Sequence, residues 1–366
     1  MRNTIVKVWK GEASYARWLL HPPLYCLSRL YGLGLRIREY LFKKGVAKID
    51  EVSIPVVSVG NITVGGTGKT PVVEKLALAL KGMGFNPGIV TRGYKRIRKG
   101  TFCVDRDRDT AEDVGDEALM LAKRTKVPVI VGARRSQAIV EGMRKCDIDL
   151  ALLDDGFQVK NTKKHVDIVV VSGGGRGGTY DLFPLGPCRE PVARVRDADA
   201  VLVNKGYLDP GMARLVDGIP TFKVQYKPAY LYNVKHNVMT HFNFLKKRKI
   251  LAFSGLGDNE SFFELLRSLG AHIVREIPFP DHHRYTPKDI EGLASCKDVK
   301  VLITTEKDAV KITGMDVPDG LFYLSIEATI EKEQELLALI RRKLEASEVT
   351  LPALGSGERA RKHWAN

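Results

Sequence analysis

The chain has 366 residues and a formal net charge of +15 at pH 7, and hydrophobic residues make up 44% of it. These values predict a globular protein of two or three domains, and the charge favours acidic partners such as nucleotides, nucleic acid or anionic lipid. A soluble protein with a basic surface also fits. The cysteines are scattered, odd in number and without a C-x-x-C pair, which argues against a disulfide framework or a zinc site and suits a reducing cytoplasm; they are Cys26, Cys103, Cys146, Cys188 and Cys296.

The N-terminal part of the chain has the composition of an interfacial helix. Residues 18–44 combine Leu, Tyr and Trp with Arg and Lys, and they lack the small-residue cleavage site of a signal peptide. No run of about 18 uncharged apolar residues occurs, so a transmembrane helix is not indicated. The segment is compatible with membrane contact and with a surface helix packed on the next domain.

The most informative motif is a predicted P-loop. An apolar run, a glycine-rich turn ending in Gly-Lys-Thr and a helical stretch follow one another at residues 56–60, 61–70 and 71–80. Glycines let backbone N–H groups close around phosphate oxygens, and the helix presents its positive end to the same anion. Lys69 can then reach the β- and γ-phosphates, and Thr70 can hold Mg²⁺. Thr63 stands where the usual pattern has glycine. An ordinary glycine-rich turn is the alternative, and the order of strand, Gly-Lys-Thr and helix argues against it.

Apolar runs rich in Val, Ile and Leu alternate with helical stretches between Ile54 and about Phe222. Such runs are typical of parallel strands buried on both faces, so we expect a doubly wound, mostly parallel α/β domain with ligands at the carboxyl ends of its strands. The expected strands are 55–59, 86–91, 127–132, 150–153, 166–171, 200–203 and 221–224.

The rest of the chain predicts a second, smaller α/β domain. Residues 222–227 and 230–234 alternate like exposed strands and predict a ribbon. Strands at 249–255 and 301–304 and helices at 259–269 and 332–344 follow. The polar, basic segment after Ser347 predicts a disordered tail. The expected division is therefore a helical segment 1–48, a P-loop domain 49–222, a ribbon 223–248, a C-terminal domain 249–346 and a tail 347–366.

Two acidic sites belong to the expected α/β domain. The strand at 150–153 ends in Asp154 and Asp155, the shape of an element whose carboxylate serves Mg²⁺, although paired acids are also common in turns. Asp116 precedes the helical run at 118–122, where an acid favours the helix dipole. Such a carboxylate, if it lies close to the phosphates, is also able to accept a hydroxyl proton during phosphoryl transfer.

The segment after the strand at 166–171 formally contains G-x-G-x-x-G, at residues 173–178. Prolines follow it instead of the helix that a dinucleotide fold needs, so we reject a nicotinamide site and expect a flexible loop over phosphates. Arg189 and Glu190 come next, as a cation and an acid for the site or as a salt bridge on the surface. Asn204-Lys205 resembles a guanine-reading motif, but Tyr207 replaces its Asp, which weakens a GTPase interpretation.

Asp281, His282 and His283 form the densest histidine site. Adjacent histidines point in different directions in most backbones, so a two-histidine metal site is not expected. A histidine paired with a carboxylate tunes a base near neutral pH. A polar loop without function is the alternative.

Taken in order, these motifs resemble one family. The run Gly60-Asn61 to Pro71 looks like the P-loop of tetraacyldisaccharide 4'-kinases of lipid A biosynthesis, and Thr63 matches that family. Residues 91–94, 113–117, 154–158, 186–191, 281–282 and 305–308 occur in the same order as in the family, and the resemblance spans roughly residues 15–345.

The resemblance implies an enzyme that transfers the γ-phosphate of ATP, with Mg²⁺, to the 4'-hydroxyl of a tetraacylated glucosamine disaccharide 1-phosphate. It implies a general base at Asp116 helped by His282, catalytic roles for Lys69, Arg189 and Glu190, and metal ligation by Thr70, Asp154 and Asp155. His282 is chosen over His283 because it follows Asp281 directly. Nucleotide contacts are implied for Asn61, Thr63, Val64, Gly65, Gly66, Thr67, Gly68, Lys69 and Thr70.

The family further implies an enzyme at the cytoplasmic face of the bacterial inner membrane that contacts inner-membrane lipids through its N-terminal helix. Two other classes remain open. A P-loop NTPase switch would hydrolyse nucleotide without an acceptor. A nucleic-acid-binding protein would use the basic charge, but the charge is dispersed and no nucleic-acid motif is present, so no nucleic acid is expected as a partner.

Overall fold

The structure is a computed structural model that describes residues 9, 14–65, 68–173, 180–204, 206–296 and 299–347, without the side chains of 14–19. Packing divides the chain into two compact units. The P-loop unit consists of the chain up to Val90, Arg134–Gln225 and the chain from Ile330, and the second unit of Thr91–Ala133 and Tyr226–Thr329. We expected domains that are contiguous in sequence. Packing instead groups segments that lie far apart in the chain, so that each unit contains strands and helices from separate segments.

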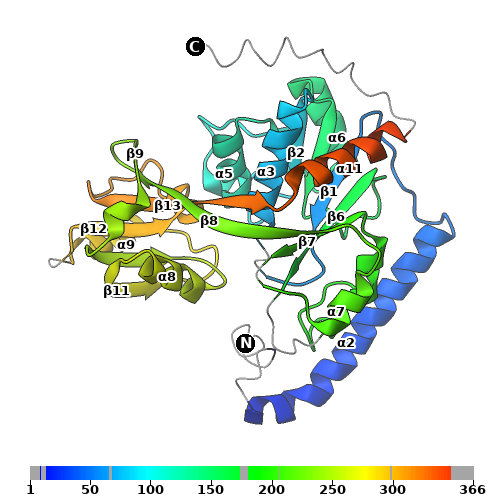
Figure 1. The fold of residues 1–366 in the computed structure, drawn as a ribbon, viewed down its shortest axis with the longest axis horizontal. Helices are drawn as coiled ribbons and strands as arrows, with labels where there is room; N and C mark the ends of the chain where they lie inside the picture. The colour runs from blue at the N-terminus through cyan, green and yellow to red at the C-terminus, as the bar shows by residue number, and fades with distance from the viewer. Residues whose placement is uncertain are drawn as a thin grey trace. The chain divides into compact units, whose positions relative to one another are not determined.

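The P-loop unit contains a parallel sheet with strand order β2-β5-β1-β6-β7-β8 (Figure 1). All five neighbouring pairs in this order are parallel. The runs predicted as strands form it, and β1, β2, β5 and β7 are buried along their whole length, as strands covered on both faces must be. The strands are β1 (Val56–Gly60), β2 (Pro87–Thr91), β5 (Leu150–Asp154), β6 (Val166–Ser172), β7 (Ala200–Asn204) and β8 (Thr221–Asn233).

Helices connect and cover these strands. Helix α3 packs on β1 and β5, and α11 packs on β6. The helical elements of the unit are α2 (Ser14–Lys43), α3 (Lys69–Gly82), α6 (Arg135–Cys146), the 3₁₀ turn η1 (Val192–Asp197), α7 (Pro210–Leu215) and α11 (Glu333–Glu345). The doubly wound α/β fold predicted from the sequence is confirmed.

The register of the sheet brings two predicted motifs together. Strands β1 and β5 are parallel neighbours, and Val59 pairs with Asp154. The P-loop leaves the carboxyl end of β1 and the acidic pair leaves the carboxyl end of β5, so both motifs emerge at the same edge.

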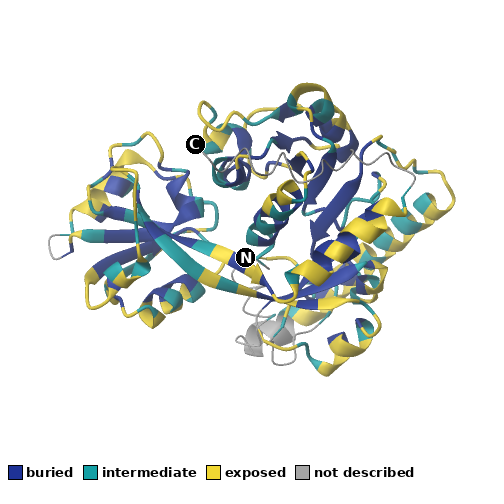
Figure 2. Ribbon diagram, turned by 45° about the horizontal axis from the view of Figure 1, so that its top comes forward, coloured by how far each residue is buried: buried dark blue, intermediate teal, exposed yellow. Residues whose placement is uncertain are grey.

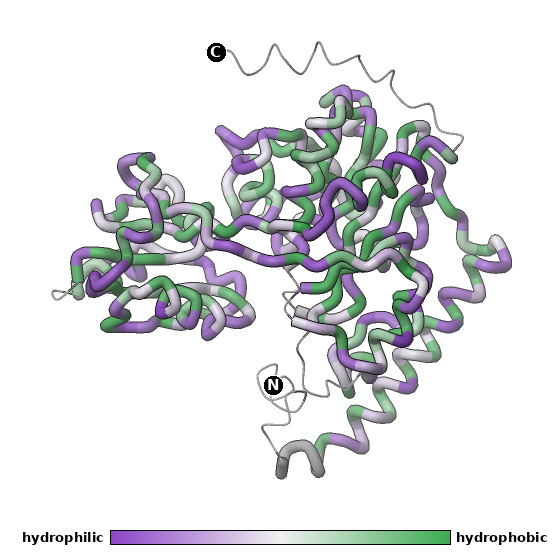
Figure 3. The backbone as a smooth tube through the Cα atoms, viewed as in Figure 1, coloured by the Kyte–Doolittle hydropathy of each residue, from purple (hydrophilic) through white to green (hydrophobic). Residues whose placement is uncertain are grey.

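Helix α2 packs one side against the segment that follows residue 180. The Ser28 hydroxyl donates to the Leu182 carbonyl at 2.9 Å, and the Tyr31 hydroxyl donates to the Arg189 carbonyl at 2.8 Å. Much of the rest of α2 is exposed (Figure 2). Hydrophobic positions recur along the helix among hydrophilic ones (Figure 3).

The exposed apolar side chains of α2 include Leu27, Leu30, Leu33 and Ile37. Their spacing of three and four residues places them on one stripe. None of the helices in the described part of the chain combines the length and apolar character that crossing a bilayer requires.

In the second unit the strand order is β11-β10-β12-β13-β8, and β8 is the same strand that borders β7. Strand β10 pairs in parallel with β11 and with β12, and β12 pairs in parallel with β13. These strands are β10 (Lys249–Ser254), β11 (His272–Pro278), β12 (Val301–Thr305) and β13 (Leu321–Ile330). Its helical elements are η2 (Phe242–Leu245), α8 (Asn259–Ser268), α9 (Pro287–Ala294) and α10 (Glu306–Ala309). The sequence did not predict β11, β13 or α9. For β11 the reason is that the strand is largely exposed and lacks a continuous apolar run.

The remaining elements of this unit come from the chain between β2 and α6. They are β3 (Phe102–Cys103), α4 (Ala111–Val114), α5 (Asp116–Thr125) and β4 (Val129–Val131), and β4 pairs with β3 in the antiparallel sense. The expected ribbon of two strands is instead the single long strand β8, which pairs with the short antiparallel strand β9 (Val238–Thr240).

Two glycines of the P-loop unit offer a matched test of its packing. A Cβ atom at Gly60 would lie 2.5 Å from both the Cβ and the backbone N of Phe157, whereas a Cβ at Gly82 would meet nothing within 4 Å. We expect Gly60→Ala to lower the free energy of unfolding by roughly 1–3 kcal/mol, because backbone cannot move aside cheaply. Gly82→Ala is expected to leave it unchanged or raise it slightly. Equal unfolding midpoints in urea for the two variants would contradict this packing.

Candidate active site

The P-loop begins where β1 ends and leads directly into α3. Gly68 has φ +75°, a left-handed conformation that suits glycine, and Lys69 and Thr70 are the first two residues of the helix. The N–H groups of a first helical turn have no intrahelical acceptor and point toward any anion placed before them. Gly66 and Thr67 of the predicted loop lie outside the described residues.

The Gly-Pro-Cys-Arg-Glu segment lies along the first half of the P-loop. The Val64 N–H donates to the Pro187 carbonyl at 2.7 Å, and the Arg189 N–H donates to the Ile62 carbonyl at 2.7 Å. Thr63 and Cys188 form the antiparallel bridge between these bonds. The backbone of this segment therefore fixes the position of the P-loop, a contact that the sequence did not predict.

The residues before and within the turn are also held by local bonds. The Asn61 side-chain amide donates to the Thr63 carbonyl at 2.8 Å, and the Gln158 amide donates to the Asn61 carbonyl at 2.5 Å. Gly65 has φ +118°, which no other residue type adopts readily. The predicted nucleotide contacts from Asn61 to Gly65 thus form one ordered turn.

Asp155 joins two predicted cations of the site. Its Oδ1 lies 3.2 Å from Lys69 Nζ, and its Oδ2 accepts from the Arg189 guanidinium at 2.8 Å. Burial favours the neutral acid, but Lys69 and Arg189 outweigh it and lower the pKa of Asp155. Asp154, the buried last residue of β5, lies beside this cluster in the sequence. Lys69, Arg189 and Asp155 therefore form one group, and Asp154 directly precedes Asp155 at the end of β5.

Glu190 is buried and doubly paired. Its carboxylate contacts the guanidinium groups of Arg38, on α2, and of Arg194, the latter at 3.1 Å. Glu190 is 1% exposed, so its pairing is a buried network and not the surface salt bridge that the sequence left open.

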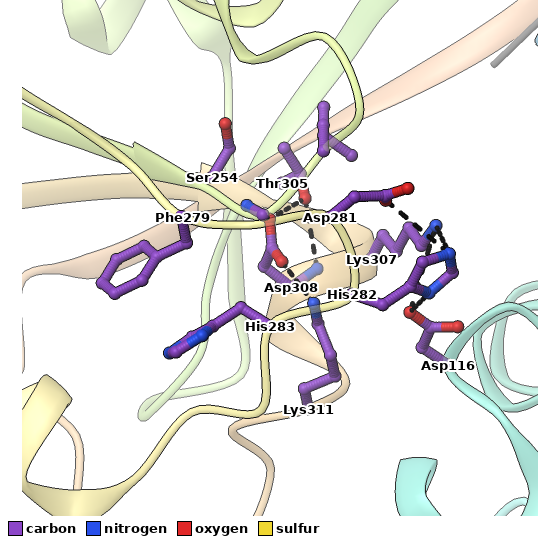
Figure 4. Close-up of polar contacts among 12 residues, drawn as sticks. Asp116, Ser254, Phe279, Asp281, His282, His283, Thr305, Lys307, Asp308 and Lys311 are labelled. Atoms are coloured by element: carbon purple, nitrogen blue, oxygen red, sulfur yellow. Dashed lines mark hydrogen bonds and ion pairs between the residues drawn. The ribbon is translucent and has the colours of Figure 1, made fainter. Parts of the chain in front are cut away.

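Asp116 and His282 contact each other within the second unit (Figure 4). His282 Nδ1 lies 2.8 Å from Asp116 Oδ2, and Asp116 Oδ1 accepts from the Glu117 N–H at 2.9 Å. Burial favours the neutral acid, yet His282 and Lys307 lower the pKa of Asp116. Both residues belong to the same compact unit, although 166 positions separate them in the chain.

His283 belongs to a different environment. Its ring stacks on Phe279 with centroids 4.5 Å apart, and its Nε2 lies 3.3 Å from Asp289 Oδ2. The structure therefore places His282, and not His283, beside Asp116.

Lys307 is the residue of this cluster to which sequence reasoning gave no role. Its Nζ lies 2.9 Å from Glu117 Oε1, 3.4 Å from His282 Nε2 and 4.0 Å from Asp116 Oδ2. The only signal in the sequence was its place in Thr305-Glu306-Lys307-Asp308, one of the segments that carry the family resemblance.

The predicted site residues thus form two groups, one in each unit. The first contains the P-loop, Asp154, Asp155, Arg189 and Glu190, and the second contains Asp116 and His282. Among the described residues, no cluster of three or more His, Cys, Asp or Glu side chains has the geometry to hold a metal ion. Residues 174–178 of the glycine-rich loop and Lys205 lie outside the described part of the chain.

Comparison with known proteins places this arrangement in a family. A sequence model described as tetraacyldisaccharide-1-P 4'-kinase matches residues 18–345, a range that contains every candidate site residue. The chain belongs to the tetraacyldisaccharide-1-P 4'-kinase family. The predicted resemblance is therefore confirmed.

Relatives in this family match nearly end to end. The chain is 34% identical over 343 residues to the tetraacyldisaccharide 4'-kinase of Shewanella oneidensis, covering 93% of this chain and 96% of the relative. It is 37% identical over 324 residues to that of Halorhodospira halophila, covering 86% and 90%. The crystal structure of LpxK from Aquifex aeolicus in complex with ATP has a TM-score of 0.75 and 33% identity, and the match covers 90% of this chain and 99% of that one.

The contact between Asp116 and His282 predicts that substitutions at the two residues have coupled effects on catalysis. Asp116→Ala and His282→Ala are each expected to lower kcat by about 10²–10⁴ and to change the KM for ATP little, because a hydroxyl nucleophile needs a base. Their double variant is expected to lose far less than the product of the two losses, since contacting residues act as a unit. His283→Ala is the matched control. Strictly multiplicative losses, or an effect confined to ATP affinity, would show that the two residues do not act together.

Proposed function

We propose that this chain is an ATP-dependent kinase that phosphorylates the 4'-hydroxyl of a tetraacylated glucosamine disaccharide 1-phosphate. Membership of the family supports the acceptor. One observation favours a kinase over a nucleotide switch: His282 Nδ1 lies 2.8 Å from Asp116 Oδ2. A switch needs no base for an alcohol, whereas a sugar hydroxyl becomes a better nucleophile when a positioned carboxylate accepts its proton.

The P-loop and its neighbours supply the groups for the nucleotide. Lys69 and Arg189 both contact Asp155, so two cations stand together beside the start of α3. A triphosphate would take these cations as partners in addition to the N–H groups of the loop. The relative from Aquifex aeolicus was solved with ATP, which supports the same nucleotide here.

The donors near the P-loop suit Mg²⁺. Magnesium keeps several waters and binds through one or two carboxylates together with phosphate oxygens. Thr70 at the start of α3 and Asp154 at the end of β5 would hold it, with Asp155 nearby. When bound, the ion neutralises negative charge on the phosphates.

The acceptor chemistry falls to the second unit. The carboxylate of Asp116 would accept the hydroxyl proton, while the sugar oxygen forms its bond to the γ-phosphorus and the bond to the ADP oxygen breaks. Asp116 is ionised at neutral pH, as an aspartate whose pKa is not raised must be, and an ionised carboxylate can accept a proton.

Helix α2 would contact the inner membrane from its cytoplasmic face. Its exposed stripe offers Leu27, Leu30, Leu33 and Ile37 to acyl chains. Arginine and lysine on the same helix suit anionic headgroups.

The kinase assignment is tested with purified protein, labelled ATP and the disaccharide 1-phosphate acceptor in detergent, followed by chromatography of the lipid product. Wild-type protein is expected to label the lipid, and Lys69→Ala to do so orders of magnitude more slowly while keeping its fold, because the variant loses a charged phosphate contact. Lys288→Ala, a change at an exposed lysine of the second unit, serves as the control. Removing Mg²⁺ with a chelator is expected to stop labelling. A folded Lys69→Ala protein with near-normal turnover would refute the assignment, and ATP hydrolysis without lipid labelling would favour a switch.

Membrane contact is tested by changing the stripe without disturbing the docked side of α2. A Leu27→Ser, Leu30→Ser, Leu33→Ser triple variant is expected to float poorly with vesicles of anionic phospholipid, because it loses apolar side chains that are 53%, 65% and 52% exposed. Serine at the exposed residues Val238 and Met239 of the second unit is the control. Undiminished flotation of the triple variant would show that the stripe does not bind membrane.

A further inference from the structure

The segment Thr305–Asp308 presents three consecutive charged side chains at the start of the short helix α10. Glu306 is 9% exposed and Asp308 is fully buried, and the side chain of Lys307 is 16% exposed. Burying charge is costly unless each charge is paired. Each of the three contacts a different part of the second unit, and those parts carry Asp116 and His282.

Glu306 fixes the helix that carries Asp116. Its Oε2 accepts from the Arg124 guanidinium at 2.7 Å, and Arg124 also donates to the Ile326 carbonyl at 3.1 Å. Arg124 and Asp116 both belong to α5. The pair therefore holds α5 against α10 and β13.

Asp308 fixes the loop that carries His282. Its Oδ2 accepts from the Gly255 N–H at 2.9 Å and from the Thr305 hydroxyl at 2.7 Å. The Gly255 carbonyl in turn accepts from the His282 N–H at 3.2 Å. His282 has φ +59°, a left-handed conformation that costs energy for a residue other than glycine and persists only where its surroundings hold it.

Lys307 lies between the two anchors and contacts the far side of the His282 ring. An ammonium group only donates hydrogen bonds, so a hydrogen bond from Lys307 to His282 Nε2, which lies 3.4 Å away, requires that nitrogen to be unprotonated and to accept. The proton of the neutral ring then sits on Nδ1, which faces Asp116 Oδ2 at 2.8 Å. Nδ1 therefore donates to the carboxylate, and Asp116 stays ionised.

We propose that Lys307 is a positioning residue that holds His282 in the Nδ1–H tautomer and Asp116 in its ionised form, ready to accept the hydroxyl proton. This inference rests on the proposed kinase function for its kinetic consequences. In the reaction the proton of the sugar hydroxyl passes to Asp116, the sugar oxygen bonds to the γ-phosphorus, and the electron pair of the broken bond stays on ADP. Lys307 itself neither gains nor loses a proton.

The electrostatics of the cluster agree with this role. Burial disfavours the ammonium, but Glu117 and Asp116 outweigh it and raise the pKa of Lys307. Two other charged groups face the pair. The Asp281 carboxylate, whose Oδ1 lies 3.6 Å from His282 Nε2, favours a proton on that nitrogen and so opposes Lys307. Lys311 lowers the pKa of Asp116 less than Lys307 does. Tyr94 packs its ring on His282, with centroids 5.0 Å apart.

The kinetic test compares Lys307→Met, which removes the charge, with Lys307→Arg, which keeps it. Lys307→Met is expected to lower kcat roughly 10- to 100-fold with little change in the KM for ATP. Because the removed cation lowers the pKa of Asp116, the acid limb of kcat/KM is expected to move about one unit or more to higher pH. Lys307→Arg is expected to keep the acid limb near its wild-type position. Lys288→Met, at an exposed lysine on α9, is the control for loss of one positive charge.

A readout that does not depend on activity separates this inference from the proposed function. In ¹⁵N-histidine-labelled protein, with the His282 signals assigned through His282→Gln, wild type is expected to show a protonated Nδ1 and an unprotonated Nε2. Lys307→Met is expected to lose that preference. A wild-type ring protonated on Nε2 alone, or a variant with unchanged tautomer and acid limb, would overturn the role of Lys307. Failure of wild type to label lipid would overturn the proposed function and leave this tautomer test standing.

Discussion

Carboxylates that leave water must be matched by cations, and this constraint organises both groups of site residues. An unpaired buried charge costs several kcal/mol, so a buried acid is stable when a cation lies beside it. Glu190 takes Arg38 from α2, and Glu306 takes Arg124 from α5. These pairs join elements that are far apart in sequence, so the charges that serve chemistry also hold the elements in place.

The same constraint gives each group a distinct chemical character. In the P-loop unit, Asp155 contacts both Lys69 and Arg189. A triphosphate has more anionic oxygens than one carboxylate and would bind the same two cations. In the second unit, the partner of Asp116 is a histidine backed by a lysine, which keeps the acid ionised and its free lone pairs able to take a proton. One unit is thus suited to hold phosphate and the other to accept a proton.

Much of the P-loop unit was predictable because its signals are local. Buried parallel strands show as runs such as Val166–Ser172, and the Gly68-Lys69-Thr70 triplet fixes a helix start by its own chemistry. The pairing of β1 with β5 was not predicted, because strand order depends on packing between distant parts of the chain. The contacts of Arg38 with Glu190 and of Lys307 with Glu117 were not predictable, because they join residues 152 and 190 positions apart. The sequence around these side chains is that of ordinary surface charges. The strand β11 escaped prediction since it is largely exposed.

The central claim is that ATP is consumed only as a hydroxyl acceptor is phosphorylated. The most direct measurement counts ADP and lipid-bound phosphate in the same samples while the acceptor concentration is raised from zero. This account predicts one lipid phosphate for each ADP at every acceptor concentration, and almost no ADP without acceptor. ADP formed at the same rate with and without acceptor, or in large excess over lipid phosphate, would contradict it.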